Sequence, residues 1–139
     1  MDASRLILHV EDDPVDVGNL RRAFSRRGIR NPIHAVPNGE GALVFLREAV
    51  ADRARRPAVI LLDLGMPVMD GLEFLEHVKA DPDLRRIPVI VFTASKREDE
   101  RCRAYELGAA GYVVKPMDPD RFAEAIGVIE RYWALCELA

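Results

Sequence analysis

The chain has 139 residues, of which 49% are apolar and 31% are charged, and its formal net charge is −3. This length suits one domain with a buried core, and the high apolar content with a small net charge excludes an intrinsically disordered protein. A dedicated nucleic-acid binder would carry a basic excess, which is absent. The longest apolar runs, residues 57–62 and 87–94, are too short to span a membrane, and the N-terminus lacks the features of a signal peptide.

Cysteine usage points to a reducing compartment. Cys102 and Cys136 have no further Cys and no His beside them at the spacing of a metal site. Two cysteines so far apart do not make the disulfide framework of a small secreted protein. We therefore expect reduced thiols in a cytoplasmic protein.

Five short runs rich in Val, Ile and Leu predict five strands. In chain order they are Leu6–Val10, Ile33–Val36, Val59–Leu62, Val89–Phe92 and Gly111–Val114. The first, third and fourth runs lack polar–apolar alternation, which is typical of a parallel sheet covered on both faces. The second and fifth are partly polar, as edge strands often are. Helix-length stretches with apolar residues three and four apart separate the runs, so the chain repeats a β-α unit five times and predicts an α/β fold.

Capping residues mark the expected ends of the helices. An Asp-Pro pair begins the first and last helices, an Asn-Gly pair begins the second, and a capping box fits the other two. The expected N-caps are Asp13, Asn38, Asp70 with Glu73, Ser95 with Glu98, and Asp118. Gly28 and Gly108 stand where the first and fourth helices should end.

Polar side chains follow four of the strands, at the carboxyl edge where open parallel sheets bind ligands. They are Glu11, Asp12, Asp13, Asp63, Thr93 and Lys115. Asp13 is explained as an N-cap, whereas Asp63 follows a central strand and would be costly to bury without a partner. The remaining three carboxylates repel one another, and one lysine cannot neutralise them, so we expect a divalent cation. Oxygen ligands with room for water favour Mg²⁺ over zinc.

Pro116, at this edge, and two histidines away from it have less specific interpretations. Pro116 would hold Lys115 in place if the bond between them were cis, which the sequence leaves open. His9 and His34 lie within predicted strands, and we interpret both as structural residues.

Taken together, these motifs resemble a two-component response-regulator receiver domain. The matching segments are Val10-Glu11-Asp12, Leu62-Asp63-Leu64 with Met66-Pro67 and Asp70-Gly71, Phe92-Thr93-Ala94-Ser95, and Tyr112-Val113-Val114-Lys115-Pro116. The resemblance covers residues 1–139 as one receiver domain without an output domain. It implies a flavodoxin-like doubly wound sheet of five parallel strands, in the order 2-1-3-4-5, with helices on both faces.

The resemblance also implies how the protein would signal. Asp63 would accept a phosphoryl group from a partner histidine kinase and form an acyl phosphate, and the domain would catalyse both this transfer and its own dephosphorylation. Lys115 would pair with the phosphoryl oxygens. Thr93 would donate a hydrogen bond to the phosphoryl group, and Tyr112 would act as an aromatic rotamer switch.

The same resemblance implies the ligands of Mg²⁺. Asp12 and Asp63 would bind the ion directly, Glu11 mainly through water, and Gly65 through its backbone carbonyl. Many receivers have Asp at the position of Glu11, but the longer Glu should still reach the metal. Many carry a polar side chain at the position of Gly65, a difference that bears on dephosphorylation rather than on phosphorylation.

Apolar residues on the last predicted helix, about residues 119–138, form two stripes with helical spacing. The stripe expected to face the core contains Phe122, Ile126, Ile129, Trp133 and Cys136. The second stripe contains Val128, Tyr132, Leu135 and Ala139. It fits either scattered surface residues or a subunit interface, and we expect the interface.

Several blocks of sequence narrow the resemblance to the single-domain regulators of bacterial phytochrome kinases. They are Asn31-Pro32, Lys79-Ala80-Asp81-Pro82, Tyr105 to Ala109, and Tyr132-Trp133. The narrower resemblance implies a homodimer through the fourth helix, the fifth strand and the fifth helix. The interface residues would be Tyr105, Val128, Tyr132 and Leu135.

Two other functions fit the residues less well. A flavodoxin-type electron carrier needs a phosphate loop rich in Ser, Thr and Gly after the first strand, where the acidic segment 11–14 would repel a flavin phosphate. A receiver-like scaffold that binds partners without phosphorylation would not need the intact set of Asp12, Asp63, Thr93 and Lys115. No site for nucleic acid or a membrane is expected.

Overall fold

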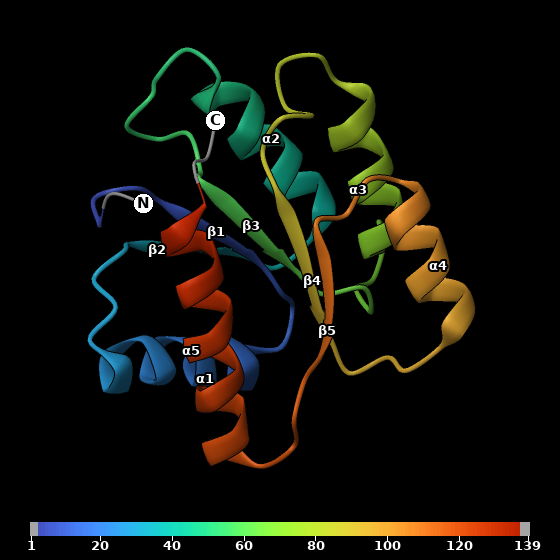
Figure 1. Ribbon diagram of the computed structural model, residues 1–139. Coiled ribbons are helices and arrows are strands. Elements are labelled where there is room, and N and C mark those ends of the chain that lie inside the picture. Colours follow the sequence, from blue (N-terminus) through green and yellow to red (C-terminus); the bar gives the residue numbers. More distant parts are fainter. Residues whose placement is uncertain (1–2, 137–139) are drawn as a thin grey trace.

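Five parallel strands form the centre of the molecule, and helices cover both faces of the sheet (Figure 1). The structure is a computed structural model that describes residues 3–136. In chain order, the elements are β1 (Ile7–Val10), α1 (Pro14–Arg27), β2 (Ile33–Val36), α2 (Gly39–Ala49), β3 (Val59–Leu62), α3 (Gly71–Ala80), β4 (Val89–Thr93), α4 (Glu98–Glu106), β5 (Gly111–Val114) and α5 (Pro119–Leu135). The strand order β2-β1-β3-β4-β5 confirms the predicted flavodoxin-like topology.

The register of the central strands brings their carboxyl ends to one level. Val10 of β1 pairs with Leu62 of β3, and the backbone N–H of Asp63 donates to the carbonyl of Val10 at 3.0 Å. On the other side, the N–H of Lys115 donates to the carbonyl of Thr93 at 2.7 Å. The residues that follow β1 and β3 therefore leave the sheet side by side, and Lys115 leaves it at the same edge beside the end of β4.

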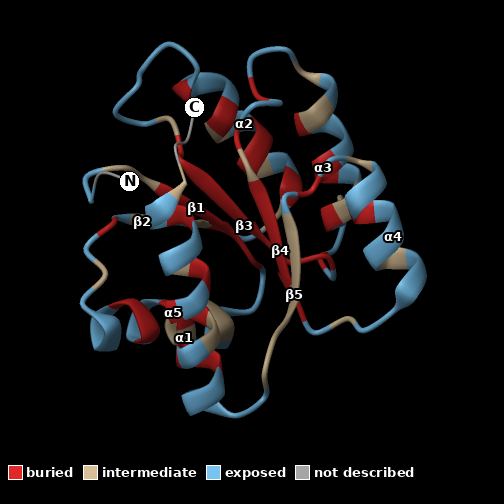
Figure 2. Ribbon diagram, in the orientation of Figure 1, coloured by how far each residue is buried: buried red, intermediate tan, exposed pale blue. Residues whose placement is uncertain are grey.

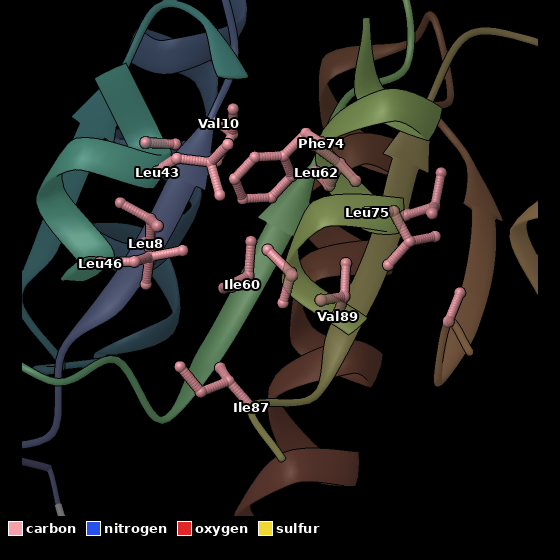
Figure 3. Packing of buried hydrophobic residues seen from close by; sticks show 14 of the residues in the cluster. Leu8, Val10, Leu43, Leu46, Ile60, Leu62, Phe74, Leu75, Ile87 and Val89 are labelled. Carbon is pink, nitrogen blue, oxygen red and sulfur yellow. The ribbon is translucent and has the colours of Figure 1, made fainter. Parts of the chain in front are cut away.

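The two faces of the sheet have separate apolar layers, because successive strand side chains point to opposite sides. Val10 and Leu62 pack under α2 and α3, where Leu43 and Phe74 join them (Figure 3). The opposite layer packs under α1 and α5 and includes Trp133. In Figure 2 the three central strands are buried, whereas β5 is only partly buried, as expected for an edge strand.

Four of the five predicted N-caps are confirmed. The side chains of Asp13, Asn38, Asp70 and Asp118 each accept a hydrogen bond from a backbone N–H in the first turn of their helix. At the other ends, Gly28 and Gly108 have φ angles of 67° and 101°, which glycine adopts without a steric penalty.

The capping box predicted for Ser95 with Glu98 is wrong. Helix α4 begins at Glu98, with Arg97 at the N-cap position and without a side-chain hydrogen bond there. The Ser95 hydroxyl instead accepts from the N–H of Arg97 and donates to Glu100. Ser95 therefore closes a turn in the loop between β4 and α4, two residues before the N-cap position.

Helix α5 is shorter than predicted and ends at Leu135, with Cys136 as its C-cap residue. Most of its predicted core stripe is buried, from Phe122 to Trp133, but Cys136 is only partly buried. Residues 137–139, which include Ala139 of the second stripe, lie outside the described residues. Across residues 3–136, none of the helices combines the length and apolar character needed to cross a membrane.

Candidate functional site

A cavity of about 440 Å³ opens at the carboxyl ends of β1, β3, β4 and β5. Its lining contains the predicted site residues Glu11, Asp12, Asp63, Gly65, Thr93 and Lys115. The strand order explains this meeting, because β1 and β3 are neighbours in the sheet although about fifty residues separate them along the chain. Side chains from four separate loops therefore face one space.

Three carboxylates in the cavity form a group that fits a divalent cation. Glu11, Asp12 and Asp63 each offer an oxygen, and these oxygens all lie within 4.8 Å of one another. Glu11 and Asp63 are buried, whereas Asp12 is exposed at the mouth of the cavity. An all-oxygen set that remains open to water on one side matches the preference of Mg²⁺ and similar hard cations.

Lys115 binds two carboxylates rather than one. Its Nζ donates to Glu11 Oε2 at 2.6 Å and to Asp16 Oδ2 at 2.8 Å, and lies 3.7 Å from Asp63 Oδ1. The side chain of Lys115 is 8% exposed, so these carboxylates take the place of water around the ammonium. No peptide bond within residues 3–136 is cis, and Pro116 therefore follows Lys115 through a trans bond.

Asp16 is a site residue that the sequence interpretation missed. It lies in the first turn of α1, three residues after the N-cap Asp13. In the sequence it looks like an ordinary acidic residue near a helix N-terminus, where the helix dipole favours one. The signal that could have found it is its position one helical turn after the acidic segment that follows β1.

Burial and hydrogen bonds act in opposite directions on the pKa values of Glu11 and Lys115. Burial raises the pKa of Glu11 to about 7, although its hydrogen bond to Lys115 acts in the opposite direction. Burial would lower the pKa of Lys115, but hydrogen bonds to Asp16 and Glu11 outweigh this effect and raise it. Lys115 is therefore held as an ammonium, and the carboxylates beside it still need more positive charge than it provides.

Thr93 and Tyr112, the predicted switch residues, meet at Ser95. Thr93 is 2% exposed, and its Oγ1 accepts from the N–H of Ser95 at 3.4 Å. The Tyr112 hydroxyl donates to the carbonyl oxygen of Ser95 at 3.0 Å. The two switch residues are therefore connected through one residue of the loop between β4 and α4.

The loop after Asp63 packs closely against the start of α3. A Cβ at Gly71 would collide with the carbonyl oxygen of Asp63 and lie 2.6 Å from the Cα of Leu64. The N–H of Gly71 donates to the carbonyl of Leu64 at 3.0 Å. Gly71 thus allows α3 to support the backbone of Asp63 from behind. At Gly65, by contrast, an added Cβ would meet no atom within 4 Å.

The predicted interface residues are exposed on a different part of the surface. The exposed fractions are 50% for Tyr105, 64% for Val128, 56% for Tyr132 and 87% for Leu135. A hollow of about 260 Å³ lies between β5 and α5, and Val128 and Tyr132 line it together with other apolar residues and glycine. Tyr105 lies on α4 and does not line this hollow.

Comparison with known proteins gives consistent matches over nearly the whole chain. The family model described as "Response regulator receiver domain" matches residues 7–127. Response regulator Rcp1 of Synechocystis sp. is 34% identical over 130 residues, which cover 93% of this chain and 88% of Rcp1.

Two crystal structures are similar to this chain in both sequence and fold. The phosphorylated cyanobacterial phytochrome response regulator RcpA is 33% identical, with a TM-score of 0.88 and coverage of 96% of this chain and 97% of that one. The Mn²⁺-bound form of Rcp1 is 33% identical, with a TM-score of 0.87 and coverage of 97% and 99%. By its sequence match and its fold, the chain belongs to the response regulator receiver domain family.

Proposed function

We propose that this chain is a response regulator whose Asp63 accepts a phosphoryl group from a partner histidine kinase. The observation that carries the proposal is the placement of Asp63 in a cavity with two further carboxylates and Lys115, whose Nζ is 3.7 Å from Asp63 Oδ1. Phosphoryl transfer requires a positioned nucleophile and compensation of charge. Asp63 is the nucleophile in this arrangement, and it lies 8% exposed at the carboxyl end of β3.

The proposed reaction is an exchange of one bond to phosphorus for another. A carboxylate oxygen of Asp63 attacks the phosphorus of a phosphohistidine on the kinase, and an O–P bond forms. The P–N bond breaks, and its electron pair returns to the imidazole nitrogen. Lys115 is close enough to pair with an oxygen of the transferred group. Attack by water on the same phosphorus later releases inorganic phosphate and restores Asp63.

We propose Mg²⁺ as the cation of the site. Glu11, Asp12 and Asp63, together with the backbone carbonyl of Gly65, are the groups that would hold it. When bound, the ion supplies positive charge that offsets the charge of the phosphoryl oxygens. The fit of the three carboxylates to an oxygen-ligand cation supports this assignment, as does the similarity to a relative crystallised with Mn²⁺.

Phosphorylation would change the contacts of Thr93 and Tyr112. A phosphoryl group adds about −1.5 to −2 charge at neutral pH and three strong acceptor oxygens. Thr93 would donate its hydroxyl hydrogen to one of them, and a shift of its side chain toward the phosphoryl group would lengthen its 3.4 Å contact with the N–H of Ser95. The Tyr112 hydroxyl donates a hydrogen bond to the carbonyl of the same Ser95, so a movement of Ser95 would also move Tyr112 on β5.

The partners follow from the family and from the exposed apolar residues. RcpA is a phytochrome response regulator by name, and we propose a sensor histidine kinase of the phytochrome class as the donor and a cytoplasmic location for this chain. We also propose a homodimer through α4, β5 and α5, with Tyr105, Val128, Tyr132 and Leu135 at the interface. Signalling would then proceed by phosphorylation-dependent binding to other proteins.

Intact-mass spectrometry after incubation with a small phosphodonor and Mg²⁺ tests the proposal. The wild-type chain should gain the mass of one phosphoryl group, and Asp63→Asn should gain none. Equal labelling of both proteins would remove Asp63 as the acceptor. A folded wild-type chain that stays unlabelled with small donors and with a cognate kinase would instead support a scaffold that works without phosphorylation.

A further inference from the structure

The ammonium of Lys115 is held by two carboxylates that lie close together in the chain, at the end of β1 and in the first turn of α1. The distances from Nζ are 2.6 Å to Glu11 and 2.8 Å to Asp16. Asp16 is fixed through its other oxygen as well, because Oδ1 accepts from Asn19 Nδ2 at 3.4 Å. Its side chain is 24% exposed, so it forms the partly open wall of the site rather than its floor.

Glu11 is required by two positive groups at once. It binds Lys115 through Oε2, and it also belongs to the three carboxylates that could hold a cation. A carboxylate that turns its charge toward a divalent cation binds a neighbouring ammonium less strongly. The side chain of Lys115 is only 8% exposed, so water is a poor substitute for a lost carboxylate, and a buried charge without a partner is strongly unfavourable. Asp16 has no place in the carboxylate group, so its contact with Lys115 can remain.

We propose that Asp16 is a positioning residue for Lys115. Asp16 keeps the ammonium of Lys115 beside Asp63 when Glu11 turns its charge toward the cation. The role of Asp16 in phosphoryl transfer rests on the proposed function. That Glu11 binds the cation while Asp16 binds Lys115 does not depend on it. Asp16 binds neither the cation nor the phosphoryl group. It acts through Lys115, and it allows one lysine and one cation to occupy the same cavity.

Asp16 should affect the binding of Mg²⁺ even when no phosphoryl group is present. Without Asp16, Glu11 must remain with Lys115, or the ammonium keeps only the longer contact with Asp63, 3.7 Å away, which is itself one of the carboxylates that could hold the cation. Either outcome weakens cation binding. Loss of a residue that supports metal ligands from behind reduces metal affinity by about 10-fold to 100-fold. If Asp16 acted only as one nearby negative charge, its removal would reduce the affinity for Mg²⁺ by less. That reduction would also be the same with and without Lys115.

Titration of the unphosphorylated protein with Mg²⁺, followed by amide NMR spectra, separates these explanations. The variants are Asp16→Asn, Lys115→Met, the double variant, and the matched control Asp13→Asn. The control removes the same charge three residues away, where the carboxylate caps α1, and Asn caps helices as well as Asp does. Asp16→Asn should weaken Mg²⁺ binding by about 10-fold or more, and Asp13→Asn should weaken it by no more than about twofold.

The double variant shows whether Asp16 acts through Lys115. In the Lys115→Met background, Asp16→Asn should change Mg²⁺ affinity no more than Asp13→Asn does in the wild-type chain. Asp16→Glu, which keeps the carboxylate, should recover part of the affinity. If the NMR spectrum shows that Asp16→Asn is unfolded, a second comparison replaces it. Asp16→Glu, which keeps the carboxylate, should then bind Mg²⁺ more tightly than Asp16→Ser, which does not.

Two results would overturn the proposal. One is an equal loss of Mg²⁺ affinity in Asp16→Asn and Asp13→Asn, and the other is a loss from Asp16→Asn that persists in full without Lys115. Failure of the proposed function has a different signature, because a chain that never accepts a phosphoryl group would still give these Mg²⁺ titrations. If Asp63 is labelled but Asp16→Asn weakens Mg²⁺ binding no more than Asp13→Asn does, the proposed function stands and only this role of Asp16 is excluded.

Discussion

The cavity at the carboxyl ends of the strands and the face formed by β5 and α5 differ in chemical composition. The cavity contains buried charges held by one another, with Lys115 between Glu11 and Asp16. The face carries a hollow lined by apolar residues and glycine, with Val128 and Tyr132 exposed on α5. Groups that are costly to bury are held by partners inside the protein, whereas apolar side chains on the face are exposed, and the proposed homodimer would cover them.

Strand β5 belongs to both regions and shows how they are joined. Tyr112 reaches toward Ser95 beside the cavity, Val113 lines the apolar hollow, and Lys115 enters the cavity directly after the strand. Side chains of a strand alternate between its two faces, so neighbouring residues serve different regions. A movement of β5 or of the loop at Ser95 would therefore change both regions together.

The largest expected effect separates two adjacent residues of α5. Trp133 is 1% exposed and packs near Phe24, whereas Tyr132 is 56% exposed. Trp133→Ala should lower the free energy of unfolding by about 3–5 kcal/mol. Tyr132→Ala should change it by no more than about 0.5 kcal/mol. Chemical denaturation measures both, and similar losses in the two variants would contradict the assignment of the two faces of α5.

The next effect concerns the buried histidine below the cavity. Burial, followed by the charge of Lys115, lowers the pKa of His9 to about 4, and Arg21 acts in the same direction while Asp16 opposes it. An unfolded chain binds this proton near pH 6.5, so stability is lost as the pH falls from about 6.5 to 4. The shift corresponds to about 3 kcal/mol.

Denaturation of wild type and His9→Gln across this pH range isolates the histidine from the carboxylates that also titrate. The variant should lose less stability than wild type on acidification. Parallel curves for the two proteins would show that His9 takes up its proton equally in the folded and unfolded chains.

A smaller effect tests the cavity as a cation site. The proposed Mg²⁺ would bind the folded chain and not the unfolded one, so it should raise the free energy of unfolding by about 1.4 kcal/mol at ten times its dissociation constant. Asp12→Ala removes an exposed ligand without disturbing the buried pair of Glu11 and Lys115, and should remove most of this gain. Thermal melts with and without Mg²⁺ measure it. An equal gain in both proteins would place the ion elsewhere.

The smallest effect on folding is expected for the apolar face, where the effect on assembly is the informative one. The variant with both Tyr132→Asp and Leu135→Asp should keep the stability of the wild-type monomer, because both side chains are exposed. It should lose the homodimer, since charges replace the apolar centre of an interface that needs roughly 800 Å² per partner. Sedimentation measures the result, and a wild-type chain that remains monomeric with and without a phosphoryl mimic would contradict the dimer.

Sequence patterns predicted those parts of the molecule that depend on neighbouring residues. Runs rich in Val, Ile and Leu predicted the strands, and an Asp directly after the third of them predicted Asp63 as a candidate site residue. Asp13, Asn38, Asp70 and Asp118 cap helices because the capping bond forms within three residues of the chain.

Interactions between distant segments were harder to predict. The contact of Asp16 with Lys115 joins residues 99 positions apart, and an Asp near a helix start has a sufficient local explanation without it. Ser95 satisfied the capping pattern, but its hydroxyl closes a turn two residues earlier. His9 was correctly placed within a strand, whereas the charges that lower its pKa come from α1 and from the residue after β5.

The most direct test of the central claim identifies the residue that carries the phosphoryl group. Borohydride reduces an acyl phosphate on Asp to homoserine, and peptide mass spectrometry then locates the change in the chain. After incubation with a phosphodonor and Mg²⁺, homoserine should appear at position 63 alone. Homoserine at position 12, or reduction of Glu11 in place of Asp63, would contradict the account of this cavity.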